Sequence, residues 1–275
     1  GDGWVITDFT GRGEEAYDVK LQSDGKIVVA GYTNTSANDD FALARYKPDG
    51  SLDTTFDGDG LVTTDLAGGH DRGYGVALQS DGKIVVVGVA YNGTNDDFAV
   101  VRYRPDGSLD PDFGSLGKVL TDFAGGGDEA QDVVLQTDGK IVVVGSASGD
   151  IALARYNPNG SLDGSFSTDG KVMSDFSSSD GAKAVVLQPD GKILVTGSIW
   201  NGPIEPEDIA VVRYSSDGIL DPLFGEGGLV TVHLLGPTVG DDILLQPNGK
   251  IVVVNAELTN YIPDILIDYS FAVVR

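Results

Sequence analysis

The chain has 275 residues, a formal net charge of −24 and an apolar content of 41%. A chain of this length and apolar content can bury a sizeable core, so intrinsic disorder is excluded. Phosphate backbones and anionic lipids repel such an acidic protein, and its apolar runs are far shorter than a bilayer span. We therefore expect no nucleic-acid partner and no membrane insertion. The absence of cysteine excludes disulfides and thiolate metal sites.

Four short β-strands are predicted in the first part of the chain, at residues 4–9, 16–22, 26–33 and 41–46. They are rich in Val, Ile, Thr and aromatic residues, and clusters of Gly, Asp, Asn and Ser separate them. No stretch of the chain shows a sustained helical period. The sequence therefore predicts an all-β protein.

The same four-strand pattern recurs along the whole chain. A Leu-Gln pair, a turn and a Gly-Lys pair occur five times, with the lysines 57, 57, 52 and 58 residues apart. These lysines are Lys26, Lys83, Lys140, Lys192 and Lys250. The repeats span approximately residues 1–57, 58–114, 115–167, 168–225 and 226–275. Four antiparallel strands at this spacing predict a single five-bladed β-propeller domain, because solenoid coils are shorter and a sandwich does not reuse one unit five times.

The character of each strand predicts its place in the blade. Residues 84–87, in the third strand of a repeat, are apolar throughout, as in a strand covered on both faces. Residues 62–65, in a first strand, alternate toward Thr and Asp and suit the outer rim. Each first strand would then complete the blade of the preceding repeat. We expect residues 4–9 to join the blade that ends at Arg275 and so close the ring.

Two of the repeated segments resemble a known family. Residues 21–31, Leu-Gln-Ser-Asp-Gly-Lys-Ile-Val-Val-Ala-Gly, and residues 45–53, Arg-Tyr-Lys-Pro-Asp-Gly-Ser-Leu-Asp, are similar to the bacterial delta-60 repeat, a β-propeller repeat of exported and surface proteins. The resemblance implies a secreted or cell-surface location and supplies no catalytic residues. The last copy departs from it, since Asn255 replaces the strand-ending Gly. Because the chain opens at Gly1 without a leader, we expect a processed form or a fragment, and a monomeric domain of a larger protein.

The loops divide between two faces of the predicted propeller. One face carries the repeated turns, which we interpret as structural because identical loops imply identical packing. The other face carries the loops that differ between copies, and it holds the candidate ligand-binding residues Tyr91, Trp200 and Tyr261. These aromatic residues suit a glycan, a peptide or a cell-surface protein, so a non-catalytic binding or structural module is predicted. Alternatively, each aromatic side chain covers only its own loop.

The inner strands place carboxylates near the predicted central axis. Asp18, Asp132 and Asp242 are candidate ligand-binding residues there, beside Gly75 and Ala184 at the equivalent positions. An acid and a nucleophile drawn from such carboxylates would make a carbohydrate-active hydrolase, which is the alternative function. No Glu or His on an inner strand completes a pair, so we expect no enzyme.

Calcium is the one cofactor that the composition suggests. Aspartate outnumbers glutamate 35 to 7, and short carboxylates in loops suit either turn capping or hard cations. Pairing of the outer strands predicts three candidate metal-binding pairs, namely Asp40 with Asp65, Asp97 with Asp122, and Asp150 with Asp175. The fourth blade pairs Asp208 with His233 instead. Capping aspartates without a cation remain the alternative.

Overall fold

The computed structural model describes residues 3–9, 13–35, 38–200, 202, 207–233, 239–259 and 268–274. It has two compact units, residues 1–135 with 158–161, and residues 136–157 with 162–275. All the regular secondary structure in the described residues is β-strand, which confirms the all-β prediction. No helix with the length and hydropathy to cross a bilayer occurs in this part of the chain.

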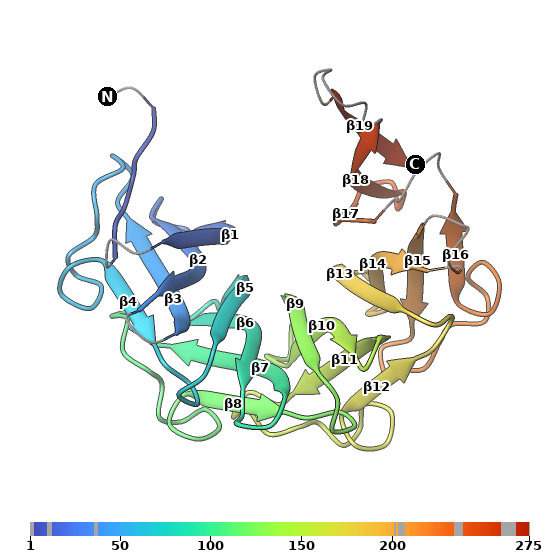
Figure 1. The fold of residues 1–275 in the computed structure, drawn as a ribbon, viewed down its shortest axis with the longest axis horizontal. Coiled ribbons are helices and arrows are strands. Elements are labelled where there is room, and N and C mark those ends of the chain that lie inside the picture. The colour runs from blue at the N-terminus through green and yellow to red at the C-terminus, as the bar shows by residue number, and fades with distance from the viewer. Residues whose placement is uncertain are drawn as a thin grey trace. The chain divides into compact units, whose positions relative to one another are not determined.

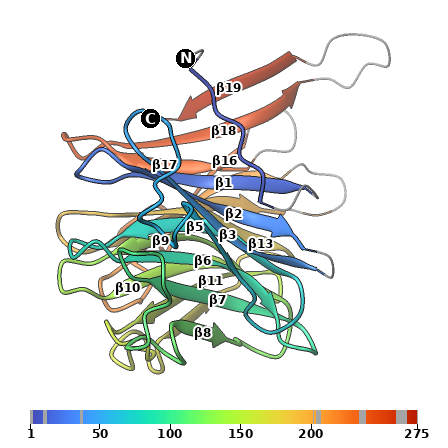
Figure 2. The ribbon, with the colours of Figure 1, turned by 90° about the vertical axis from the view of Figure 1, so that its left-hand side faces the viewer.

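The first unit contains two four-stranded sheets, with strand orders β1-β2-β3-β4 and β5-β6-β7-β8, in which neighbours are antiparallel (Figure 1). Figure 2 shows β5 to β8 in this order. A ninth strand, β9, packs against β5, β6 and β7. The bounds are β1 (Glu14–Leu21), β2 (Ile27–Asn34), β3 (Asp39–Tyr46), β4 (Leu61–Thr64), β5 (Asp71–Leu78), β6 (Ile84–Tyr91), β7 (Asp96–Tyr103), β8 (Lys118–Thr121) and β9 (Asp128–Leu135).

The second unit repeats the pattern. Its strands pair antiparallel in the orders β10-β11-β12, β13-β14-β15-β16 and β17-β18-β19. The bounds are β10 (Ile141–Ala147), β11 (Asp150–Tyr156), β12 (Lys171–Ser174), β13 (Asp180–Leu187), β14 (Ile193–Ile199), β15 (Asp208–Tyr214), β16 (Leu229–Val232), β17 (Asp242–Leu245), β18 (Ile251–Thr259) and β19 (Asp268–Val274).

Each complete sheet combines three strands of one repeat with the first strand of the next. The outer strand β4, for example, comes from the second repeat and pairs with β3 of the first. The two middle strands of the β5-β6-β7-β8 sheet are its most buried, and Ile84, Val85, Val86 and Val87 of β6 have no exposed surface. The predicted strand order, from a small-residue inner strand to a polar outer strand, is confirmed.

A glycine near the end of the second strand sets the length of the inner strand. A Cβ atom at Gly31, Gly88 or Gly197 would lie 1.9, 1.9 or 1.8 Å from an inner-strand carbonyl oxygen. Asn255 takes this place in the last repeat, and there the pairing of inner and second strands reaches only Val254. The side chain of Asn255 thus explains why β17 has four residues where β1, β5, β9 and β13 have eight.

The prediction that residues 4–9 close the ring is wrong. The β17-β18-β19 sheet has three strands, and residues 4–8 form no strand; Arg275 lies outside the described residues. The segment instead contacts β3 through its side chains, since the Tyr46 hydroxyl donates to Thr7 Oγ1 at 2.7 Å. Tyr103 of β7 donates in the same way to Thr64 of β4, the outer strand of the preceding sheet, at 2.8 Å. Residues 4–9 therefore contact β3 through side chains as β4 contacts β7.

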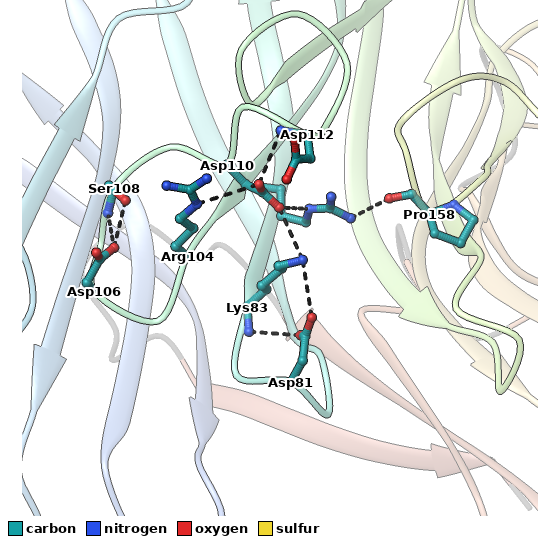
Figure 3. A network of polar contacts seen from close by, with 9 residues as sticks. Asp81, Lys83, Arg104, Asp106, Ser108, Asp110, Asp112 and Pro158 are labelled. Carbon is teal, nitrogen blue, oxygen red and sulfur yellow. Dashed lines mark hydrogen bonds and ion pairs between the residues drawn. The ribbon is translucent and has the colours of Figure 1, made fainter.

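Buried ion pairs repeat at the ends of the strands that carry the repeated turns, and Figure 3 shows those of the second repeat. In the second repeat Arg102 Nε donates to Asp110 at 2.8 Å, and its guanidinium lies 4.5 Å from the ring centroid of Phe113. Lys83 Nζ lies 3.4 Å from the same carboxylate. A second guanidinium nitrogen of Arg102 donates to the carbonyl oxygen of Pro158, 56 residues away, at 2.5 Å. We call this arrangement the arginine clamp.

The ion pairs of the arginine clamp recur in four repeats, and Arg45, Arg102 and Arg155 also donate to a carbonyl oxygen of the next repeat. Its Arg, Asp and Lys members are Arg45, Asp53 and Lys26; Arg102, Asp110 and Lys83; Arg155, Asp163 and Lys140; and Arg213, Asp221 and Lys192. Burial alone would raise the pKa of Asp53, but hydrogen bonds from Thr55 and the Arg45 charge lower it to about 2. The clamps therefore need ionised carboxylates, and they serve structure.

Deletion of residues 1–9 is expected to lower the melting temperature by several degrees. The deletion removes the Thr7 partner of Tyr46 and opens a cavity of about 420 Å³ over β2 and β3, which Val5 and Phe9 also line. Such losses cost about 1–3 kcal/mol. Differential scanning calorimetry measures the shift, and deletion of residues 1–3 is the control that leaves these contacts intact. Equal melting temperatures for the intact chain and the longer deletion would show that the segment covers nothing.

Acid is expected to destabilise the protein through the clamps. Because the folded-state pKa of Asp53 is depressed, its contribution is fully present above about pH 4 and is lost as pH falls toward 2. Asp53→Asn should cost about 3 kcal/mol at neutral pH, because it leaves the buried Arg45 unpaired. It should also flatten the fall in unfolding free energy between pH 4 and 2. Urea titrations at several pH values test this, and an unchanged pH slope in the variant would contradict it.

Candidate functional site

Aspartates converge at the opposite face, where the chain passes from one sheet to the next. Asp40 is the second residue of β3, and the pairing of Phe41 with Thr64 brings it beside Asp65, which directly follows β4. The chain then turns and reaches Asp71, the first residue of β5. Strand register and one short loop therefore bring three carboxylates together.

The convergence occurs three times in the described residues. In each cluster the carboxylate oxygens lie within 4.8 Å of one another. The clusters are Asp40, Asp65 and Asp71; Asp97, Asp122 and Asp128; and Asp150, Asp175 and Asp180. All three predicted pairs thus lie together in the structure, and each gains a third aspartate that the sequence analysis missed. A signal for that residue existed, since each third aspartate lies seven residues before the leucine of a Leu-Gln pair.

Burial leaves carboxylate oxygens of the first cluster without partners. Asp71 has no exposed surface; its Oδ2 accepts a hydrogen bond from the Leu66 N–H at 2.6 Å, while its Oδ1 has no partner. Asp40 is 6% exposed, and its Oδ1 also has no partner. Burial raises the pKa of Asp71 to about 6, and the charges of Asp65 and Asp40 add to this. Burial likewise raises the pKa of Asp40.

The second cluster has the same geometry. Asp128 Oδ2 accepts the Phe123 N–H at 2.7 Å, as Asp71 accepts that of Leu66. Asp97 is 5% exposed; its Oδ2 accepts a hydrogen bond from Asn92 at 2.8 Å, and its Oδ1 is buried without a partner. Burial raises the pKa of Asp97, and the neighbouring Asp122 charge raises it further.

The third cluster is better satisfied by protein groups. Asp180 accepts hydrogen bonds from the backbone N–H groups of Phe176 and Ser177, at 2.6 and 2.8 Å, and from the Ser177 hydroxyl. Burial, followed by the charges of Asp175 and Asp180, raises the pKa of Asp150. We therefore expect this cluster to attract a cation less strongly than the first two.

Three carboxylates this close repel one another unless protons or a cation lie between them. Ca²⁺ binds six to eight oxygen ligands in flexible geometry, whereas Mg²⁺ requires a near-ideal octahedron. The all-oxygen donor set of the clusters fits a hard divalent cation. In the fourth blade the set is changed, since His233 Nδ1 lies 2.6 Å from Asp208 Oδ1 in the place of the second aspartate.

The inner-strand aspartates lie elsewhere. A bulge between Ala16 and Asp18 shifts the register of β1. Asp18 Oδ2 accepts the N–H of Val76 on the neighbouring inner strand β5 at 2.9 Å, and its carboxylate pairs with Lys20 at 2.8 Å. Asp132 and Asp242 each accept the N–H of the following residue at 2.7 Å. None of the three belongs to a carboxylate cluster in the described part of the chain.

Two of the predicted aromatic residues occupy equivalent positions. Tyr91 ends β6 and is 38% exposed, while Trp200 directly follows β14 and is half-buried. The backbone N–H of Tyr91 donates to the His70 carbonyl oxygen at 3.1 Å, and that of Trp200 donates to Ser179 at 2.9 Å. Tyr261 lies outside the described residues.

Comparison with protein families decides the class of repeat. The sequence model of a family described as a domain of unknown function (DUF5122) β-propeller matches residues 22–56, 79–113, 136–166 and 188–224, together half of the chain. The chain belongs to this β-propeller family. The DUF5122 match confirms the propeller repeat that the sequence predicts, while the delta-60 name stays a prediction. Comparison with curated proteins finds no match for this DUF5122 chain.

Solved structures similar to this DUF5122 propeller come from other proteins. A catalytically inactive virginiamycin B lyase from Staphylococcus aureus is 12% identical, with a TM-score of 0.50 over 96% of this chain and 86% of that one. An endo-arabinase from Bacteroides thetaiotaomicron is 10% identical, with a TM-score of 0.45 over 95% and 93%. A putative glycoside hydrolase from Parabacteroides distasonis is 14% identical, with a TM-score of 0.48 over 89% and 84%. The lyase similarity shows a shared fold alone.

Millimolar Ca²⁺ is expected to raise the melting temperature of this DUF5122 propeller, because a ligand that binds only the folded state stabilises it by mass action. Asp71→Asn should reduce the gain more than Asp180→Asn, whose carboxylate already accepts three hydrogen bonds. Calorimetry in calcium and in chelator measures both effects. Identical melting curves in the two buffers would leave the aspartates as caps.

Proposed function

We propose that the chain is a non-catalytic, calcium-binding β-propeller module that acts outside the cell. One observation carries the proposal, namely that a fully buried carboxylate oxygen of Asp71 lacks a protein partner and belongs to a cluster with Asp40 and Asp65. Burying an unpaired carboxylate is costly unless a cation or a proton neutralises it. Because the cluster recurs in successive blades, we propose that cation binding is a shared property of these repeats.

Calcium suits this site better than other hard cations. The carboxylates come from a strand, a strand end and the start of the next strand, so the donor set is spread over elements that adjust separately. Ca²⁺ tolerates such irregular sets and binds extracellular modules with Kd values of about 10⁻⁴–10⁻³ M. A site of this strength fills at the calcium levels outside cells, which supports a secreted or cell-surface location.

The face with the variable loops is the proposed partner surface. The arginine clamps stabilise the opposite face with contacts that recur in each repeat. Residues on the variable face do not take part in these contacts and can differ between repeats. We propose that five blades form one domain of a larger protein, and that this face presents Tyr91, Trp200 and Tyr261 to a glycan, a peptide or a cell-surface protein. Bound cations would then stabilise the strand ends from which these loops extend.

The inner-strand aspartates support a non-catalytic module better than a hydrolase. A glycosidase needs two carboxyl groups that face one substrate across about 5–10 Å of space. Asp18 is instead engaged by a backbone N–H of a neighbouring strand and by Lys20. The side chain of Asp132 turns to its own backbone.

Equilibrium dialysis with radioactive calcium tests the cation site directly. We expect about three ions per chain, one for each cluster. Asp71→Asn should remove one ion, whereas Asp49→Asn, in an exposed turn of the opposite face, should remove none. Binding of no calcium at millimolar concentration would overturn the proposal. Turnover of any substrate in a polysaccharide panel, lost in Asp132→Asn, would favour the hydrolase alternative.

A further inference from the structure

A polar hollow of about 460 Å³ lies on the variable face of the first unit, over β5 and β6. Its size falls in the range of small-molecule sites. Besides Val89, the lining side chains are polar or aromatic, and they are His70, Arg72, Tyr74, Tyr91, Asp96 and Glu129. The arginine clamps and the aspartate clusters use none of these residues.

The ring of Tyr91 is fixed in place at one wall of the hollow. A Cβ atom at Gly69 would lie 2.8 and 2.9 Å from side-chain atoms of Tyr91, so only glycine allows the ring to pack against this backbone. The backbone N–H of Tyr91 is bound to the His70 carbonyl oxygen. Tyr91 is 38% exposed and packs against the Gly69 backbone, so its ring is a preformed surface on which a flat apolar face of a ligand can stack.

Arg72 is equally fixed, and its charge is already neutralised. Asp39 accepts hydrogen bonds from Arg72 Nε at 2.7 Å and from a terminal guanidinium nitrogen at 2.5 Å. The guanidinium carbon lies 4.9 Å from the centroid of the Tyr32 ring, and Asn34 binds the other Asp39 oxygen at 2.8 Å. Arg72 therefore presents oriented donors to the hollow and adds no net positive charge.

Tyr74 lies near both Arg72 and Glu129 in the wall of the hollow. Burial, followed by the charge of Glu129, raises the pKa of its hydroxyl, so it stays a neutral phenol. The ring of Tyr17 meets that of Tyr74 edge to face at 4.9 Å and supports it. Glu129 and Asp96 supply acceptors at the walls.

Arg72 departs from the repeat, which sets the hollow apart from the scaffold. At its position the other repeats have Glu15, Glu129 and Gly181, while at the Tyr74 position only the first repeat also has a tyrosine, Tyr17, and the others have Gln131 and Lys183. Packing that every blade needs recurs in every blade, as the clamps do. A fixed, polar and aromatic arrangement that occurs in one blade therefore indicates recognition of a ligand.

We propose that this hollow is a saccharide-binding site, with Tyr91 as the stacking platform and Arg72, Tyr74 and Glu129 as hydroxyl partners. A sugar offers a flat C–H face together with hydroxyl groups that both donate and accept, and the hollow has a matching aromatic face, donors and acceptors. A charged ligand fits less well, because the guanidinium is already paired with Asp39. The proposal rests on the proposed binding function, and it names the ligand class and the blade.

Binding of neutral oligosaccharides tests the site. The probes are cellotetraose, xylotetraose, mannotetraose and arabinotetraose, each titrated into the protein in calcium by calorimetry and by saturation-transfer NMR. At least one should bind, and Tyr91→Ala and Glu129→Gln should each weaken it tenfold or more. Asp49→Asn, in an exposed turn of the opposite face, is the control and should leave the affinity unchanged. Melting temperatures within two degrees of the parent chain would show that the variants fold.

The outcomes separate this inference from the wider function. Binding that Trp200→Ala abolishes and Tyr91→Ala spares would overturn the hollow as the site while leaving a binding module. Binding of a lysine-rich peptide, lost in Glu129→Gln and not competed by the sugars, would overturn the ligand class. Failure of all four probes to bind while the chain takes up calcium would overturn the saccharide site and spare the cation proposal.

Discussion

A buried arginine in each of three successive repeats carries the interaction on which the rest of the structure depends. Arg102 binds Asp110 of its own repeat and, with another nitrogen, the carbonyl oxygen of Pro158 in the next repeat. Arg45 bonds in the same way to Asp53 and to the Pro105 carbonyl oxygen. One side chain thus joins the turn within a blade to the turn of its neighbour. Because both ions are buried, loss of either would strand the other at a cost of several kcal/mol.

The clamps use a large share of the basic side chains of an acidic protein. The chain has 18 basic residues, and the four clamps use eight of them, one Arg and one Lys in each. Few cations remain for the other 42 − 4 = 38 acidic side chains. On the variable face, Asp40, Asp71 and Asp97 each have a buried Oδ1 atom without a hydrogen-bond partner, which leaves these atoms to bind protons or metal ions.

Sequence predicted the features that each repeat specifies by itself. The strand order followed from the apolar second strand and the polar outer strand, and the Asp40 and Asp65 pair followed from their register. Asp71 was missed because the path of the loop before it depends on backbone geometry that no side-chain period reveals. The bulge at Tyr17 was not predicted, and it adds one residue to β1, where Asp18 accepts the N–H of Val76. The hollow over β5 was not predicted, since its donor Arg72 and its acceptors Asp96 and Glu129 come from three strands that are distant in sequence.

Each aspartate cluster draws on two successive repeats, and this affects how the protein unfolds. Asp40 lies in one sheet, and Asp71 opens the next. In a repeat array, the free energy of each interface between neighbours decides whether the units unfold together or one after another. An ion bound between two blades adds to that interface term and leaves the intrinsic stability of either blade unchanged. Calcium would therefore act on cooperativity: in its presence the blades melt as one, and in chelator the array loosens blade by blade.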